Sequence, residues 1–133
     1  MPTVEQDIAF NAVSKDYAEE MIKLFGLEHL RKRHPQSLSE GQKRRVSIAA
    51  VAAGNPKVLL LDEPTVGQDY KGLCELVKIL DELHDNSGNT MITITHDMRC
   101  AEALCDRAVI IADGVVAEQG GKELAHKYFF EKI

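Results

Sequence analysis

The sequence predicts an α/β protein built on a parallel sheet, from two observations. First, apolar segments of strand length alternate with helical patterns over residues 56–119, in the order strand, helix, strand, helix, strand. Second, polar pairs stand directly after two of these strands, Asp62-Glu63 and His96-Asp97. Ligands of parallel α/β sheets bind beyond the carboxyl ends of the strands, so both pairs fall where a site is expected.

Two helices are expected to open the chain. Thr3 and Gln6 have the spacing of a capping box, which begins a helix within residues 1–13. The second helix starts near Ser14, and Gly26 stops it. The residues expected on the buried faces are Val4, Ile8 and Ala12 in the first helix and Ala18, Met21, Ile22 and Phe25 in the second.

A charged connector, residues 27–36, leads into a third helix. Ser39 and Gln42 form a second capping box at its start. Gly54 has the composition of a C-cap, and Pro56 forbids continuation of the helix. The apolar face of this helix is expected to consist of Val46, Ala49, Ala50 and Ala53.

The segment 58–61 is wholly apolar and is predicted to be a buried strand that delivers Asp62-Glu63 to its carboxyl end. An amphipathic helix follows, for which Asp69 is a suitable N-cap. Residues 86–89 are expected to form the turn after it. The residues of this helix at core spacing are Leu73, Leu76, Val77, Leu80 and Leu83.

The remaining elements are shorter. Residues 91–95 are predicted to form a strand, and Asp97 caps a short helix that carries Ala101 and Leu104. The last elements expected are a strand at 107–112, a tight turn at Asp113-Gly114, a returning strand at 115–119 and a closing helix at 122–132 that carries Leu124, Tyr128 and Phe129.

Composition excludes several classes. A net charge of −5 argues against nonspecific nucleic-acid binding, and the basic runs 31–34 and 43–45 suit solvated surfaces. No apolar run approaches the about 20 residues needed to span a bilayer, and no signal peptide is expected. Three cysteines, odd in number, suit buried thiols in a reducing cytosol, although a zinc or redox pair of Cys100 and Cys105 is an alternative.

Chemistry can be assigned to three groups. Beyond the strand end the carboxylates of Asp62 and Glu63 can reach one ligand, and Mg²⁺ prefers such hard oxygen ligands. The imidazole of His96 can donate to a phosphate. The helix that starts at Ser39 presents N–H groups and partial positive charge, which suit an anion. The structural alternatives are a solvated acidic loop, a structural histidine and a plain capped helix.

Four segments together resemble the ABC-type ATPases. LSEGQ, at 38–42, looks like the signature motif of the family. VLLLDEP, TVGQD and ITITHD look like the Walker B strand, the D-loop and the switch-histidine segment, in the family's order. TVGQD together with TVEQDIAFN, at 3–11, is most similar to the energy-coupling-factor group, which imports vitamins and metal ions.

The resemblance implies a partial P-loop NTPase (RecA-like) parallel sheet with part of the ABC helical subdomain. Residues 1–55 would be the helical subdomain and signature helix. Residues 56–133 would carry the Walker B strand, D-loop, switch histidine and carboxyl-terminal hairpin and helix. The implied cofactors are ATP and Mg²⁺.

The resemblance also implies a role for each site residue. Asp62 would hold Mg²⁺, Glu63 would orient or deprotonate the attacking water, and His96 would contact the γ-phosphate. The remaining residues would face the ATP held by the opposite subunit of a dimer; these are Ser39, Gly41, Gln42 and Asp69.

The chain departs from the family pattern in three ways. Glu40 stands where the signature motif usually has glycine, and Gln68 stands where the D-loop commonly has leucine. The phosphate-binding pattern G-x-x-x-x-G-K-[ST] does not occur, so the resemblance lacks the Walker A half. We therefore expect a Walker B strand with unpaired backbone, an association-prone fold, and no ATPase activity without a complementing chain.

The implied function is that of an ATPase subunit that energises membrane import. Its expected partners are a second ABC ATPase subunit, identical or different, and a transmembrane transporter subunit, with no nucleic acid. The expected location is the cytoplasm, peripheral on the inner face of the cell membrane. Two alternatives stay open: a soluble ABC-type ATPase acting in DNA repair or on ribosomes, and a non-catalytic module that completes a partner's site.

Overall fold

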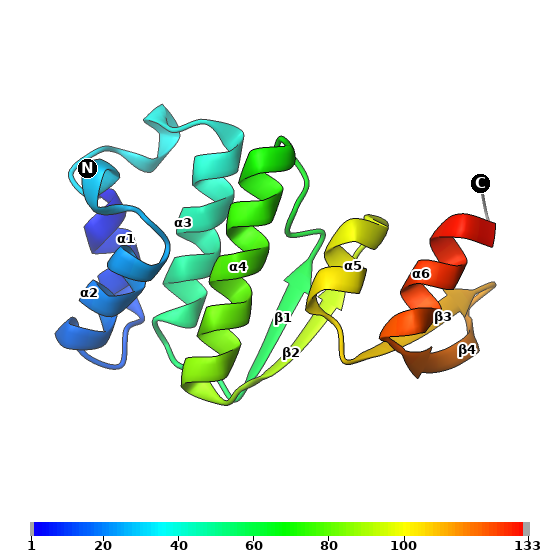
Figure 1. Cartoon of the computed structure of the whole chain (residues 1–133). Coiled ribbons are helices and arrows are strands. Elements are labelled where there is room, and N and C mark those ends of the chain that lie inside the picture. The colour runs from blue at the N-terminus through cyan, green and yellow to red at the C-terminus, as the bar shows by residue number, and fades with distance from the viewer. Residues whose placement is uncertain (1, 132–133) are drawn as a thin grey trace.

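The computed structural model describes residues 2–131 and the side chains of residues 2–127. Figure 1 shows the order of the elements, with helices α1 to α3 at one end, a parallel strand pair in the middle and a hairpin with its helix at the other end. No helix in this range is long and apolar enough to cross a membrane.

The amino-terminal part is helical, as predicted. Helix α1 (Val4–Phe10) and helix α2 (Lys15–Leu24) are followed by two 3₁₀ turns, Glu28–Leu30 and Pro35–Ser37. The Oγ of Thr3 accepts from the amide of Gln6, whose side chain accepts from the amide of Thr3, so this capping box is confirmed. Gly26 ends α2 with φ +66°, a conformation that glycine adopts at little cost.

Helix α3 (Glu40–Ala52) begins with the capping box predicted at Ser39 and Gln42. Its end differs from the prediction. Ala53 is the C-cap, and the left-handed residue that follows is Asn55, at φ +50°, rather than Gly54. Asparagine is one of the few residues that tolerate this conformation, so the chain reverses one residue later than glycine placement suggested.

The middle of the chain is a parallel strand–helix–strand unit. Strand β1 (Val58–Asp62) pairs with strand β2 (Thr90–Ile94) in the register Leu60 to Ile92. Helix α4 (Tyr70–Ser87) connects them, and the carboxylate of Asp69 caps it as predicted. The helix runs into the segment expected to be a turn and ends at Gly88, which has φ +65°. The core side chains of α4 are Leu73, Leu76, Leu80 and Leu83.

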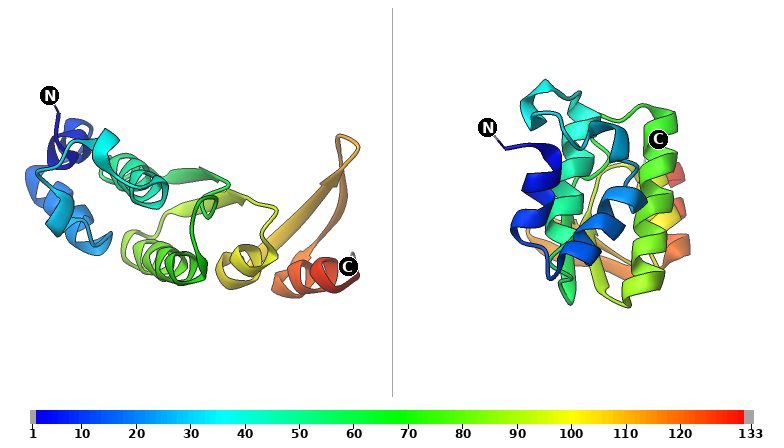
Figure 2. Two further views of the ribbon diagram at one scale, coloured as in Figure 1. Left: turned by 90° about the horizontal axis from the view of Figure 1, so that it is seen from above. Right: turned by 90° about the vertical axis from the view of Figure 1, so that its left-hand side faces the viewer.

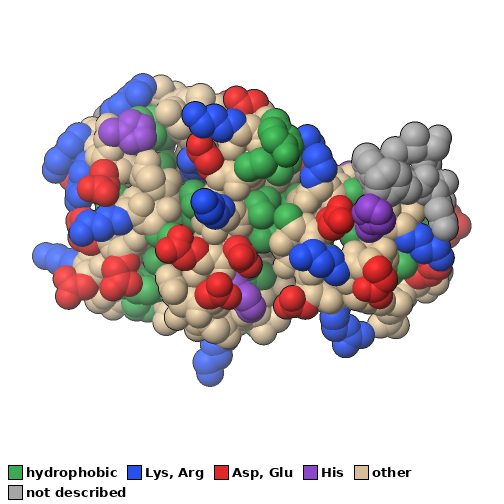
Figure 3. All heavy atoms as spheres, viewed as in Figure 1, with side chains coloured by type: hydrophobic (Ala, Val, Ile, Leu, Met, Phe, Trp, Pro, Cys, Tyr) green, Lys and Arg blue, Asp and Glu red, His purple; other side chains and the backbone are tan. Residues whose placement is uncertain are grey.

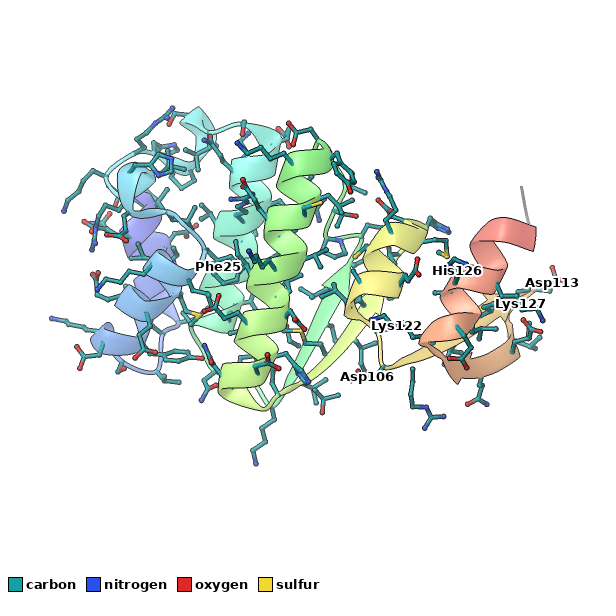
Figure 4. The ribbon with its side chains drawn as sticks, viewed as in Figure 1. Phe25, Asp106, Asp113, Lys122, His126 and Lys127 are labelled. Carbon is teal, nitrogen blue, oxygen red and sulfur yellow. The ribbon has the colours of Figure 1, made fainter. Side chains whose placement is uncertain are left out.

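The prediction that the third strand joins the parallel sheet was wrong. After helix α5 (Met98–Leu104), strand β3 (Arg107–Ala112) pairs antiparallel with strand β4 (Val115–Gly121) in a separate two-stranded sheet. Asp113 and Gly114 both have positive φ, which matches the twist of a tight hairpin. Figure 4 shows Asp113 at its tip. The local hairpin therefore provides the backbone partners of β3.

Helix α6 (Lys122–Glu131) closes the described chain beside α5. The imidazole of His126 lies 3.2 Å from a carboxylate oxygen of Glu102 on α5, and Figure 4 shows His126 and Lys122 on the α6 ribbon. Leu124 is buried as predicted. The side chains of Tyr128 and Phe129, also predicted for this helix, lie outside the described residues.

The prediction that segment 58–61 is buried was wrong for two of its four residues. Leu59 and Leu61 are buried against the helices, but Leu60 is 70% exposed. In Figure 2, helices α4, α5 and α6 lie along one side of the strands, and no described element covers the other side. We call this uncovered surface the open face; its apolar members are Val58, Leu60, Ile92 and Ile94.

Candidate functional site

The carboxyl ends of β1 and β2 lie side by side. Asp62 is in register with Ile94, and the amide of Glu63 donates to the carbonyl oxygen of Ile94 at 2.7 Å. The pairing therefore continues one residue beyond β1. Glu63 adopts a left-handed conformation, φ +49°, which turns the chain away from the sheet.

The structure brings Glu63 and His96 together. The Nε2 of His96 lies 3.5 Å from one carboxylate oxygen of Glu63, and the amide of His96 donates to the other at 3.4 Å. The imidazole is 97% exposed, whereas the Glu63 side chain is only 27% exposed. The histidine can therefore reach an incoming ligand while a half-buried carboxylate stays beside it, which is a suitable arrangement for orienting a water molecule.

Asp62 is the last residue of β1 and lies on the open face, where it is exposed. It directly precedes Glu63 in the sequence. Among the described residues, no three His, Cys, Asp or Glu side chains gather as a metal site. A single carboxylate nevertheless fits Mg²⁺, which keeps several waters and shares phosphate oxygens. Asp62 is the residue that would hold it, because it ends the strand and is open to solvent.

The second group surrounds the start of α3. The Oγ of Ser39 accepts from the amide of Gln42 at 3.2 Å, and the Oε1 of Gln42 accepts from the amide of Ser39 at 3.0 Å. These contacts fix the first turn of a 13-residue helix. Glu40 does not stand alone there, because the Nζ of Lys43 lies 3.4 Å from its carboxylate and offsets its charge.

Asp69 belongs to this second group. Its Oδ1 accepts from the amide of Gly72 at 2.7 Å, so the residue caps α4 while it remains exposed. The neighbouring Gln68 contacts the main chain of Gly41, which joins the loop before α4 to the start of α3. The structure thus brings Glu63 and His96 into contact, with Asp62 beside them at the end of β1. Asp69 is linked to the Ser39–Gln42 turn only through its neighbour Gln68.

Two residues at the site were not predicted as functional. Gln68 was noted only as a departure from the family pattern. Arg99 was not noted; its guanidinium bonds Asp97 through two nitrogens, lowers the pKa of that carboxyl, and lies 5.7 Å from the ring centre of Tyr70. Spacing alone could have indicated Arg99, because a residue two positions after an N-cap aspartate can bond it.

Cys100 is fully buried behind the site. Burial raises the pKa of its thiol to about 11, so the thiol is neutral at physiological pH. A neutral, inaccessible thiol behaves as a small apolar side chain, as expected. The expectation of buried thiols was wrong for Cys74, which is exposed.

Left-handed geometry at Glu63 carries a cost that can be measured. We expect the free energy of unfolding of Glu63→Gly to exceed that of Glu63→Ala by about 0.5–1 kcal/mol, because only glycine avoids steric conflict at this φ. Glu63→Gly should therefore unfold at a higher urea concentration. Both variants lack the carboxylate, so the difference isolates the backbone. Equal urea midpoints would show that the turn carries no strain.

Known proteins resemble this chain in sequence over the residues that form the site. The family model described as ABC transporter matches residues 2–66, which include α1 to α3, β1 and Glu63. An energy-coupling factor transporter ATP-binding protein, EcfA2 of Bacillus thuringiensis, is 43% identical over 98% of this chain. The match covers 48% of that relative.

Two solved structures have the same fold. The first is cbiO1 from Clostridium perfringens, described as part of the ABC transporter complex cbiONQ, with a TM-score of 0.82 at 37% identity over 98% of this chain and 54% of its own. The second is the ATP-binding cassette MJ0796, a dimer in a post-hydrolysis state bound to ADP and Pi, with a TM-score of 0.75 at 30% identity over 90% of this chain and 54% of its own. The chain spans about half the length of the relatives it matches.

Proposed function

This chain belongs to the ABC transporter ATP-binding family, and we propose that it is part of an ATPase subunit that energises an ABC-type membrane importer. The transported compound would be a vitamin or a metal ion, in keeping with the similarity to energy-coupling factor proteins. The proposed reaction is hydrolysis of ATP to ADP and phosphate.

One observation carries the proposal: Glu63 and His96 meet at the ends of adjacent parallel strands. Glu63 would orient or deprotonate the water that attacks the γ-phosphate, and the exposed imidazole of His96 would donate to that phosphate. Mg²⁺, held by Asp62, would supply charge neutralisation on the phosphate oxygens when bound.

The group around α3 would act on a second nucleotide. The first turn, which contains Ser39, Gly41 and Gln42, presents a helix N-terminus that suits a phosphate. No contact joins these residues to Glu63 or His96 among the hydrogen bonds of the described chain. This separation favours a dimer of ATPase subunits, with Asp69 at the same interface, and the dimeric relative MJ0796 supports it.

The open face indicates what the chain needs in order to act. Within the described residues, no third strand pairs with β1 or β2, and four apolar side chains of these strands are exposed. The relatives have about twice the length of this chain, so the part of their fold outside the match is the occupant we propose. That part would also supply the phosphate-binding loop.

The membrane partner is proposed from the relatives. The cbiO1 structure is described as part of a transporter complex, so we propose that this chain contacts a transmembrane subunit and lies on the inner face of the cell membrane. Acidic and basic side chains are interspersed on the face shown in Figure 3, without an extended basic surface there. This distribution gives no support to nucleic acid as a partner.

A second candidate is a non-catalytic module that completes a partner's site. It is favoured by the capped first turn of α3, which is fully formed in this chain although no phosphate-binding loop is present. In that case the Ser39–Gln42 turn would serve the ATP of another subunit, and Glu63 would have no reaction of its own.

The test supplies the missing part. The segment of cbiO1 that this chain does not match is mixed with the chain, or fused to its amino terminus, and ATP hydrolysis is measured. Turnover is expected from the fused protein and the mixture, and from neither component alone. Turnover by this chain alone would contradict the need for the missing part. A folded fusion that binds ATP without hydrolysing it would contradict the proposed catalytic role.

A further inference from the structure

Gln68 connects two helices that are distant in sequence. Its side chain is half-buried, and its Nε2 donates to the carbonyl oxygen of Gly41 at 3.1 Å, across 27 residues of chain. Its own amide donates to the carbonyl oxygen of Thr65 at 3.2 Å, which holds the loop in a turn. The side chain therefore reaches from this loop to the first turn of α3.

The side-chain amide group of Gln68 lies between two glycines, Gly41 and Gly72. A Cβ atom added to Gly41 would lie 3.1 Å from both the Nε2 and the Oε1 of Gln68. A Cβ added to Gly72, in the first turn of α4, would lie only 2.6 Å from the same Oε1. The amide thus occupies a space that the two helices leave open only because each has glycine there.

A further approach joins the same two segments. A Cβ on Gly67 would lie 3.6 Å from the Cβ of Glu40, so the loop main chain packs directly against the start of α3. Leucine in place of Gln68 would keep the bulk but would have no donor for the Gly41 carbonyl. The hydrogen bond to the Gly41 carbonyl oxygen therefore requires a side-chain donor at position 68, which glutamine supplies and leucine does not.

We propose that Gln68 is a positioning residue that clasps the first turn of α3 to the first turn of α4, so that Ser39–Gln42 and Asp69 move as one body. Its consequence for ATP turnover rests on the proposed function, because those residues are proposed to face the second nucleotide. The clasp itself does not depend on that function.

Hydrogen exchange in the isolated full chain tests the clasp. Gln68→Met keeps the length of the side chain and removes the donor. We expect the amides of Gln42 and Gly72 to exchange about tenfold faster, since one hydrogen bond is lost, while amides of the β3–β4 hairpin keep their rates. Gln119→Met, on exposed β4, is the matched control and should change neither amide. Unchanged rates at Gln42 and Gly72, or equal acceleration throughout the chain, would overturn the proposal.

A double-mutant cycle gives a second measurement. Gly72→Ala should lower the melting temperature by roughly 3–5 °C in the native sequence, because the new methyl group meets the Gln68 amide. In a Gln68→Ala background, the same substitution should lower the melting temperature by less, because only the 3.1 Å approach to the Oδ1 of Asp69 remains and alanine favours helix. The same shift in both backgrounds would show that Gln68 does not occupy this space.

The fused ATPase then separates positioning from simple stabilisation. Gln68→Met is expected to lower kcat about tenfold with KM unchanged, because the nucleotide itself would be gripped by the supplied half. An unchanged kcat would refute the positioning role. Failure of the unmodified fusion to hydrolyse ATP would instead refute the proposed function, and the exchange experiment would still decide whether the clasp exists.

Discussion

Glu63→Gln in the fused ATPase is expected to lower kcat at least about 100-fold, the effect of removing a general base. Glutamine keeps the size of the side chain and an oxygen near His96, but it cannot take a proton from water. Because the half-buried carboxylate lies between its strand end and the exposed imidazole, its loss should act on the chemical step more than on ATP binding. Steady-state turnover with a parallel measurement of nucleotide affinity would check this.

The matched control is Glu118→Gln, an exposed glutamate on β4, which belongs to the separate hairpin sheet. It makes the same change of charge and should leave kcat unaltered. If Glu63→Gln retained full turnover, the reaction would have to use another base, and the assignment of Glu63 would be wrong.

Leu60→Asp is expected to abolish assembly with the complementing half while leaving the isolated chain folded. Leu60 is 70% exposed on the open face, so a polar replacement should change the free energy of unfolding by no more than about 0.5 kcal/mol. In the assembled protein the same carboxylate would be buried without a partner. The affinity of the two halves should therefore fall by roughly 100-fold or more, with loss of turnover in the mixture.

Titration of the two halves, followed by the appearance of ATPase activity and by co-elution, measures this effect. Phe10→Asp is the control, because Phe10 is also an exposed apolar residue, 85% accessible, but lies at the end of α1 away from the open face. Equal affinity for Leu60→Asp and the native chain would show that the open face is not where the other half docks.

Local elements were predicted well because their causes are local. The capping boxes at Ser39 and Thr3 involve side chains and amides within one turn, so residue spacing is sufficient to predict them. The same holds for the cap at Asp69 and for the Asp113-Gly114 turn. The meeting of Glu63 and His96 was also expected, because the carboxyl ends of parallel strands share one edge of the sheet.

Three features could not be read from spacing. The apolar run of β1 suggested that both faces of this strand are buried, but only one face is covered by helices. Whether the other face is covered depends on segments distant from β1 in the chain. Spacing predicted the hairpin of β3 and β4 but not that β3 would fail to join the parallel sheet, which depends on competition between the local hairpin and a distant parallel partner. Gln68 was visible only as an unusual residue, since its partner lies 27 positions away.

The helices, their caps and the residue types at the strand ends follow from local spacing, because they depend on neighbours within a few positions. The uncovered surface of the sheet and the side chains that join α3 to the loop before α4 follow from the packing of the folded chain. Burial and long-range hydrogen bonds depend on how whole elements pack together, and a packing partner that is distant in the chain leaves no mark in local spacing.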